Sequence, residues 1–217
     1  MPFHDEILLL DPSGAVFLSA ARMLVVADLH FEKSSSAALQ GSLLPPYDTR
    51  ITLLKLQRVV NLYQPMSLVF LGDSFHDRTG HNRLHTADFA LLRKLAAKTR
   101  IIWVTGNHDP DLDSLPGEIV PCWQEGNICL RHEAQIINSH YEISGHFHPK
   151  ASIMTRGKRI TRPCFAMHNK RLMLPAFGTY TGGLDVNAAG IASLFPAGGQ
   201  VFLLGKDRLF RFAMPIV

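Results

Sequence analysis

Five short segments of this chain carry side chains that bind metal ions. In chain order they contain Asp28 and His30, then Asp73, then Asn107, then His132, and finally His146 and His148. Carboxylate, amide and imidazole groups in this mixture suit Mn²⁺, iron or Zn²⁺. We therefore interpret the chain as a scaffold that brings the five segments to one site with two metal ions.

The segments differ in how specific each one is as a motif on its own. Gly106-Asn107-His108-Asp109, which follows an apolar run, and Gly145-His146-Phe147-His148 are the most informative. Gly72-Asp73 is a common turn sequence, and Asp28-Leu29-His30 is a weak signal in isolation. The order of the segments and their position after predicted strands carry the interpretation.

The fourth segment has two candidates. His132 and His140 both precede the final motif. His140 abuts an apolar run at 141–144 that we expect to be a strand, so we prefer His132 as the ligand and keep His140 as the alternative.

Such a site suits attack on a phosphate ester, whose negative oxygens repel a nucleophile. Two metal ions about 3.5–4 Å apart neutralise this charge, lower the pKa of a bound water and hold the phosphate oxygens during an in-line displacement. One carboxylate must lie between the ions, and nearby neutral histidines can protonate the leaving oxygen.

The elements that position these side chains follow from hydrophobic patterning. Apolar runs at 23–27, 67–71 and 101–104 predict strands, and each is followed directly by a ligand segment. A helix capped by Asp48 and closed by Pro65 is expected from the apolar spacing of Leu53, Leu56, Val60 and Tyr63. A second helix is expected at about 86–98, and 31–46 is expected to be a loop. A hairpin is predicted at 6–19, and further strands at 128–131, 141–144, 153–156, 160–163, 172–174, 201–204 and 209–212.

The strands and helices alternate in the first half, whereas the second half is rich in strands. This order predicts an α/β fold with parallel strands and a second sheet packed against the first. We see no linker and no internal repeat, so residues 1–217 are expected to form a single domain.

Composition narrows the class of protein. Apolar residues make up 47% of the 217 residues, which favours a compact globule, and no apolar run approaches the roughly 20 residues of a membrane helix. The first residues are acidic where a signal peptide would be basic, so a cytoplasmic location is expected, with no membrane partner. Three cysteines without a paired motif predict reduced thiols: Cys122, Cys129 and Cys164.

Positive charge is concentrated in one interval. Between Glu142 and Asp185 there are seven basic residues and no acidic one, so the net charge of +4 leaves −3 for the rest of the chain. This interval suggests a phosphate-rich substrate, and a solvated face of β-hairpins explains it equally well. Within it we select four candidate substrate contacts: Arg156, Lys158, Arg159 and Tyr180. Tyr180 lies in a glycine-rich segment, where a structural role is the alternative.

Taken together, the segments resemble the motifs of the calcineurin-like metallophosphoesterase superfamily over positions 28–148. The resemblance implies that Asp28, His30, Asp73 and His148 bind one metal ion and that Asp73, Asn107, His132 and His146 bind the other. It further implies that Asp73 bridges the ions, that His108 acts as an acid or stabilises the transition state, and that Asp109 orients His108.

A closer resemblance is to a bacterial branch, the ligase-associated DNA-damage-response metallophosphoesterases. Residues 28–34, 72–77 and 145–149 carry it. It implies two packed mixed β-sheets flanked by helices, a four-layer αββα sandwich, and a nuclease that works with a DNA ligase and a helicase. His76 and Asp77 lie just after Asp73, where contact with the site and a plain turn are equally good interpretations.

Three functions follow as hypotheses. The first is a phosphodiesterase dependent on two metal ions, most plausibly Mn²⁺ with iron or Zn²⁺ as alternatives, that acts as a DNA nuclease in repair. The second is a phosphatase or phosphodiesterase for a nucleotide or another small molecule, for which we would expect a closed pocket instead of a long cationic groove. The third is a protein-binding scaffold without catalysis.

Overall fold

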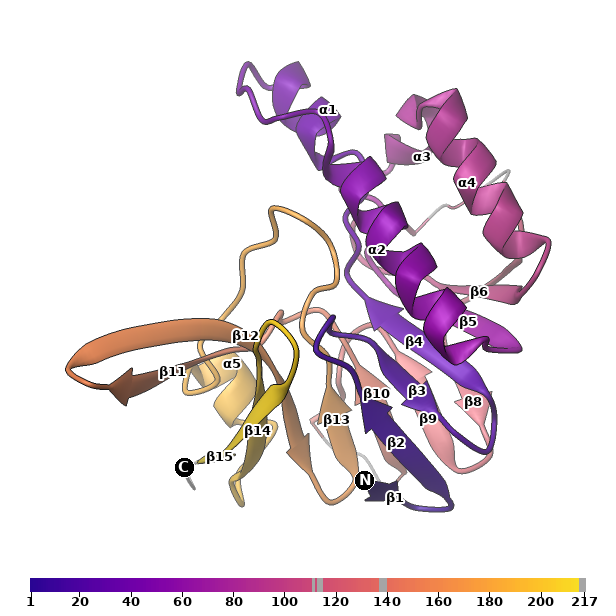
Figure 1. Ribbon diagram of the computed structural model, residues 1–217. Helices are drawn as coiled ribbons and strands as arrows, with labels where there is room; N and C mark the ends of the chain where they lie inside the picture. Colours follow the sequence, from indigo (N-terminus) through magenta and orange to yellow (C-terminus); the bar gives the residue numbers. More distant parts are fainter. Residues whose placement is uncertain (111, 113–114, 137–139, 215–217) are drawn as a thin grey trace.

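The computed structural model describes all residues except 111, 113–114, 137–139 and 215–217. Two β-sheets pack face to face, with helices on their outer sides (Figure 1). The first sheet contains, in spatial order, β1 (Pro2–Phe3), β2 (Glu6–Leu10), β3 (Val16–Leu18), β4 (Met23–Ala27), β5 (Ser67–Leu71), β6 (Arg100–Val104) and β7 (Glu118–Val120). The second runs β15 (Leu209–Met214), β14 (Gly199–Leu204), β12 (Lys158–His168), β13 (Arg171–Met173), β10 (Tyr141–Ser144), β9 (Ile128–Arg131) and β8 (Trp123–Glu125), and β11 (Lys150–Thr155) pairs with β12. The helices are α1 (Lys33–Leu39), α2 (Asp48–Tyr63), α3 (Gly80–Arg83), α4 (Thr86–Ala96) and α5 (Ala189–Ala192).

Alternation along the strands of the first sheet creates two separate cores. In β4, Met23, Val25 and Ala27 point into the core between the sheets, whereas Leu24 and Val26 face the helices. Successive side chains of a strand point to opposite faces, so a strand that is apolar at every position is buried on both. β5 and β6 follow the same rule.

The outer layers are unequal. α2 and α4 cover the first sheet, where Leu56 and Leu92 pack in one core with the stacked rings of Phe70 and Trp103. α5 is a single turn, and its Ile191 packs on the outer side of the second sheet. The prediction of an α/β fold with two mixed sheets flanked by helices, the αββα order, is therefore confirmed.

Strand direction brings the ligand segments together. β4, β5 and β6 are parallel, and their last residues Ala27, Leu71 and Val104 lie side by side. In the second sheet β9 and β10 are also parallel, with Arg131 opposite Ser144. The segments that follow these five strands therefore start at the same end of the two sheets, where α/β folds present their sites.

Two local predictions were wrong. The segment 31–46 contains α1, and Asp48 is the first residue of α2, not its cap. Tyr47 occupies the cap position, and the buried Asp48 carboxylate accepts hydrogen bonds from the backbone amide and hydroxyl of Ser34. Asp48 therefore fastens α1 to α2. Sequence patterning also missed the short elements β1, β7, β8, α3 and α5.

The remaining composition-based expectations can be compared directly with the structure. Cys129 and Cys164 are buried free thiols, and Cys122 is an exposed one. Among the described residues, no helix is both long enough and apolar enough to cross a membrane.

Candidate metal centre and active site

Two groups of potential metal ligands lie at the end of the sheets described above. Donor atoms of Asp28, His30 and His148 all lie within 4.8 Å of one another, and so do those of Asp73, His132 and His146. Asn107 joins the second group, with its Oδ1 2.9 Å from His132 Nε2. His132 Nδ1 lies 3.6 Å from Asp28 Oδ1, so the two groups are adjacent. The fold therefore brings together all seven residues that the sequence singles out as ligands.

The first group consists of imidazoles facing a buried carboxylate. His30 Nε2 lies 3.2 Å from His148 Nε2, and His148 Nε2 lies 3.6 Å from Asp28 Oδ1. Burial, with help from the neighbouring His148, lowers the pKa of His30 to about 3. The His30 ring is therefore neutral near pH 7 and has a lone pair to offer.

In the second group, Asp73 is the central carboxylate. His132 Nε2 lies 3.4 Å from Asp73 Oδ2 and 3.0 Å from His146 Nδ1. Burial alone would raise the pKa of Asp73, but the hydrogen bond and charge of His132 and the amide of His108 outweigh it and lower the pKa to about 2. Burial opposes protonation of His132, yet Asp73 and Asp28 raise its pKa. The pair therefore behaves as an anionic carboxylate facing an imidazole.

These donor sets fit divalent cations. Metal binding requires ionised carboxylates and unprotonated imidazole nitrogens. His132 and the His108 amide favour the ionised state of Asp73, and burial favours the neutral state of His30. Two ring nitrogens 3.0–3.2 Å apart also need a shared proton or a cation between them, and both groups contain such a pair. The mixture of oxygen and nitrogen donors suits Mn²⁺, iron or Zn²⁺.

Gly72 has a stricter role than its common turn sequence suggests. Its φ is +74°, and a Cβ at this position would lie 2.1 Å from His132 Nδ1. Only a residue without a side chain lets His132 approach Asp73, so Gly72 is part of the ligand geometry.

The ligand segments have an unusual backbone. Positive φ values between 43° and 71° occur at Asp28, His30, Asp73, His146 and His148. Left-handed conformations cost about 1–2 kcal/mol for residues other than glycine, and they cluster where surrounding contacts over-determine them. Such contacts are present, because the His146 amide donates to both Asp28 carboxylate oxygens at 3.0 and 3.2 Å. The amide of His30 also donates to the carbonyl of Asp73 at 3.0 Å.

His108 lies at the mouth of the site. Its side chain is 43% exposed, and its Nε2 is 3.9 Å from Asp73 Oδ2. Its backbone amide donates to Asp73 Oδ1 at 2.9 Å, and its ring meets the edge of His30 with centroids 5.4 Å apart. An exposed imidazole so close to the ligands can exchange a proton with a bound molecule.

Asp109 follows His108 in the sequence and is buried. Its carboxylate accepts hydrogen bonds from the amides of Phe75 at 3.0 Å and Gly106 at 3.1 Å. Burial raises its pKa to about 7, against the effect of the Phe75 amide. Asp109 therefore joins the two loops that carry Asp73 and Asn107, and its role in orienting His108 stays a prediction.

The structure distinguishes the two residues that the sequence left open. The His76 ring stacks on His108, with centroids 5.7 Å apart and an interplanar angle of 13°, and it meets the edge of His30 at 5.5 Å. It is therefore part of the site. Asp77 instead pairs with Arg83 at 2.5 Å, which lowers its pKa, and serves the local turn.

The basic interval divides into exposed and buried parts. Arg156 and Lys158 are exposed at the tip of the β11–β12 hairpin, which projects from the sandwich (Figure 1). Arg159 is 69% exposed, with its Nη2 3.9 Å from Asp185 Oδ2. Arg171 has a structural role, because it pairs with the buried Glu142 at 3.0 Å and donates to the carbonyl of Leu194. Arg156, Lys158 and Arg159 on the hairpin are therefore exposed to a substrate, whereas Arg171 is not.

Tyr180 and His140 are both at the surface. Tyr180 is 38% exposed in the segment between β13 and α5 and has a φ of +61°. His140 is exposed and belongs to neither ligand group in the described part of the chain, whereas His132 is buried between them.

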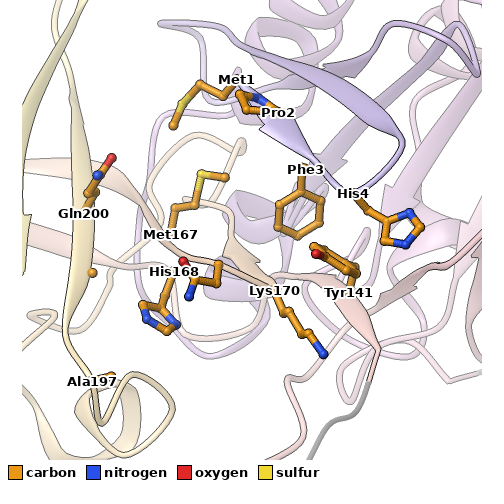
Figure 2. Close-up of a pocket in the computed structure, with 12 residues that line it drawn as sticks. Met1, Pro2, Phe3, His4, Tyr141, Met167, His168, Lys170, Ala197 and Gln200 are labelled. Carbon is orange, nitrogen blue, oxygen red and sulfur yellow. The ribbon is translucent and has the colours of Figure 1, made fainter.

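Two cavities define the surroundings. One of about 820 Å³ is lined by His4, Tyr141 and Lys170 among others (Figure 2). It lies at the start of β10 and is lined by none of the candidate ligands, two of which, His146 and His148, follow the other end of that strand. The other, of about 550 Å³, is lined by Asn107 and His132 and so adjoins the second ligand group.

Comparisons with known proteins agree with this geometry. The family model described as calcineurin-like phosphoesterase matches residues 21–180. The crystal structure of Pseudomonas putida nuclease MPE is similar with a TM-score of 0.74 and 28% identity, covering 98% of each chain. Yfce, a phosphoesterase from E. coli, shares 14% identity at a TM-score of 0.45, over 89% of this chain and 99% of its own. A search of curated proteins found no match.

Proposed function

The chain belongs to the calcineurin-like phosphoesterase family of metal-dependent hydrolases that act on phosphoesters, and from this premise we propose that it is a two-metal phosphodiesterase that cleaves DNA. The observation that carries the proposal is the pair of adjacent three-residue groups, Asp28 with His30 and His148, and Asp73 with His132 and His146. Two ligand groups that touch, with a central carboxylate between them, are what a two-ion phosphoester site requires.

The ligand roles that we propose are those implied by the resemblance of the motifs. Asp28, His30, Asp73 and His148 would hold one ion, and Asp73, Asn107, His132 and His146 would hold the other, with Asp73 shared. The grouping of Asp28 with His30 and His148, and of Asp73 with His132 and His146, supports this assignment. Ions bound there would supply an activated water and neutralise charge on the phosphate. We favour Mn²⁺, because both groups mix oxygen and nitrogen donors, and Fe or Zn²⁺ is the alternative.

His108 is the proposed acid. Its exposed ring at the mouth of the site can donate a proton to the leaving oxygen or stabilise the charge that develops there. Asp109 is a positioning residue in this proposal, because its carboxylate joins the loops that carry Asp73 and Asn107.

Two observations support a nucleic-acid substrate. The β11–β12 hairpin begins at Lys150, two residues after His148, and displays Arg156, Lys158 and Arg159 to solvent. Cationic side chains beside a phosphoester site attract a polyanion, and binding that depends on them weakens with salt. The similarity to a protein described as a nuclease points the same way. A role in DNA repair with a ligase and a helicase, in the cytoplasm, is the wider context that we propose from the resemblance of the motifs.

A small-molecule phosphatase is the second candidate, and one observation favours it. The cavity of about 550 Å³ beside Asn107 and His132 is in the size range of small-ligand pockets. A nucleotide or phosphomonoester bound there would place its phosphate against the second ligand group.

The test measures Mn²⁺-dependent turnover of single-stranded DNA and of p-nitrophenyl phosphate, with the Asp73→Ala variant as the blank. Cleavage of DNA that the blank lacks is the expected result. Turnover of the monoester alone would replace the nuclease with the small-molecule phosphatase. Metal binding without turnover of either substrate would leave only a non-catalytic scaffold.

A further inference from the structure

The segment from Ala176 to Gly183, which we name the rim loop, rises above the sheets between β13 and α5 (Figure 1). It begins against one ligand segment, where the Phe177 amide donates to the Ala27 carbonyl at 2.8 Å and the Gly178 amide to the Asp28 carbonyl at 3.2 Å. Just past its other end, the Leu184 amide donates to the Phe147 carbonyl at 3.2 Å. The rim loop therefore connects the backbone at Asp28 with the backbone next to His148, and both of these residues belong to the first ligand group.

The approach at the first end leaves no room for a side chain. A Cβ on Gly178 would lie 1.9 Å from the carbonyl oxygen of Leu29. The position of the rim loop relative to Asp28 and His30 is thus fixed by backbone contact.

A half-buried lysine on α2, Lys55, contacts the same loop from the side. Lys55 Nζ donates to the Phe177 carbonyl at 2.9 Å and lies 3.8 Å from the centroid of the Phe177 ring. Burying an ammonium group costs free energy that an apolar residue would not. We therefore interpret Lys55 as a residue that fixes the position of the loop, and not as one that raises the stability of the fold.

A second residue of α2 makes a parallel contact. The Thr179 amide donates to Thr52 Oγ1 at 3.2 Å, and the two threonine hydroxyl oxygens are 3.1 Å apart. Thr52 is buried, and it lies one helical turn before Lys55. Lys55 and Thr52 together hold Phe177 and Thr179, which precede Tyr180 in the rim loop.

Tyr180 follows directly with a left-handed backbone and an exposed ring. An aromatic side chain presented on a fixed segment beside a phosphoester site is suited to stack on a base. We infer that Tyr180 stacks on a nucleobase next to the scissile phosphate, and that Lys55 and Thr52 are the positioning residues that hold it there. This inference rests on the proposed nuclease function, and its substrate class is single-stranded nucleic acid.

The first experiment compares Tyr180→Ala and Tyr180→Phe on two substrates, single-stranded DNA and p-nitrophenyl phosphate, with KM and kcat measured for each. The alanine variant is expected to raise KM for DNA at least about fivefold, because stacking on one base is lost. KM and kcat for the monoester, which has no base, should stay within about twofold, and the phenylalanine variant should restore the wild-type KM for DNA. Equal effects on both substrates, or no effect on DNA, would overturn the inference.

The second experiment tests the positioning residues through their dependence on Tyr180. Lys55→Met keeps the apolar stem and removes the hydrogen bond to Phe177, and Thr52→Val removes the hydroxyl with little change in shape. Each should raise KM for DNA in the wild-type background and have no further effect in the Tyr180→Ala background. Arg58→Met is the matched control, because Arg58 is an exposed cation one helical turn after Lys55 in α2.

The two experiments separate the inference from the function on which it rests. A wild-type protein that does not cleave DNA would refute the nuclease and the inference together. DNA cleavage that is insensitive to Tyr180, or a Lys55→Met effect that persists without Tyr180, would refute the inference alone. If Lys55→Met fails to fold, as judged by circular dichroism, Thr52→Val carries the same test.

Discussion

The ligand site and the basic hairpin lie next to each other in sequence but are built differently. Four of the candidate ligands are buried: Asp28, His30, Asp73 and His132. Their segments have a strained backbone and contact one another at several points, as Asp28 does with His146, His132 and His148. The hairpin is a two-stranded projection whose cations are exposed, with one long ion pair between Arg159 and Asp185. A change in the first region should therefore abolish function in a single step, whereas changes in the second should alter affinity by degrees.

Loss of Asp73 is the largest effect that we expect. Asp73→Ala removes the central carboxylate, so the protein should lose both equivalents of metal and all metal-dependent turnover. Metal content by mass spectrometry after dialysis provides the measurement. The control is Asp5→Ala, which removes an exposed carboxylate remote from the ligands. If the Asp73 variant kept one full equivalent, the carboxylate would not be shared.

His108→Ala should separate chemistry from metal binding. We expect two equivalents of metal to remain and kcat to fall by about 10²–10⁴, the usual contribution of a general acid. The readout is kcat on both substrates beside the metal content. Full activity in this variant would show that the exposed ring takes no part in the reaction.

The His132→Ala variant should lose one metal ion, because the His132 ring contacts Asp73, Asn107 and His146. His140→Ala is the matched control, since it removes an exposed histidine eight residues away. Titration of the apoprotein with Mn²⁺ by calorimetry should show one weakened site for the first variant and two unchanged sites for the second. The opposite pattern would assign the ligand to His140.

Gly72→Ala tests whether the approach of His132 to Gly72 is required. The new Cβ must displace the His132 ring, so we expect a weaker second metal site and a loss of stability of at least about 1–2 kcal/mol. The control is Gly41→Ala, because Gly41 also has a positive φ, +79°, but no atom within 4 Å of the added Cβ. Thermal melts should show a lower melting temperature for both variants, because both strain the backbone. Titration with Mn²⁺ should show weaker binding for Gly72→Ala alone.

Charge reversal on the hairpin should have the smallest effect. The double variant Arg156→Glu with Lys158→Glu should raise KM for DNA. The plot of the logarithm of the binding constant against the logarithm of the salt concentration should become shallower by about 0.7 for each phosphate contact that is lost. Turnover of p-nitrophenyl phosphate should be unchanged. Arg211→Glu, a change at another exposed arginine, on β15, is the control. An unchanged salt dependence would make the hairpin a solvated surface only.

Much of the fold and of the candidate site follows from local patterns. Runs such as Leu24-Val25-Val26 can be buried on both faces only in a central strand, and the polar segment after each such run lies at one sheet edge. The ligand residue types were therefore predictable from spacing alone. The short helix α1 was not, because its serines are weak helix formers and one of them, Ser34, is held by Asp48 from the next helix.

What the sequence by itself determined is the set of candidate ligand side chains, with His140 as the alternative to His132, and the strands that precede them, because both are encoded in periodicity and motif spacing. Only the tertiary structure decided which neighbours act on them. It turned Asp109 toward two backbone loops, placed His76 against His108, paired Arg171 with Glu142, and brought Lys55 beneath Phe177. The Lys55 contact joins positions 122 residues apart, and no local pattern specifies which distant side chain will fill the space beside a given carbonyl.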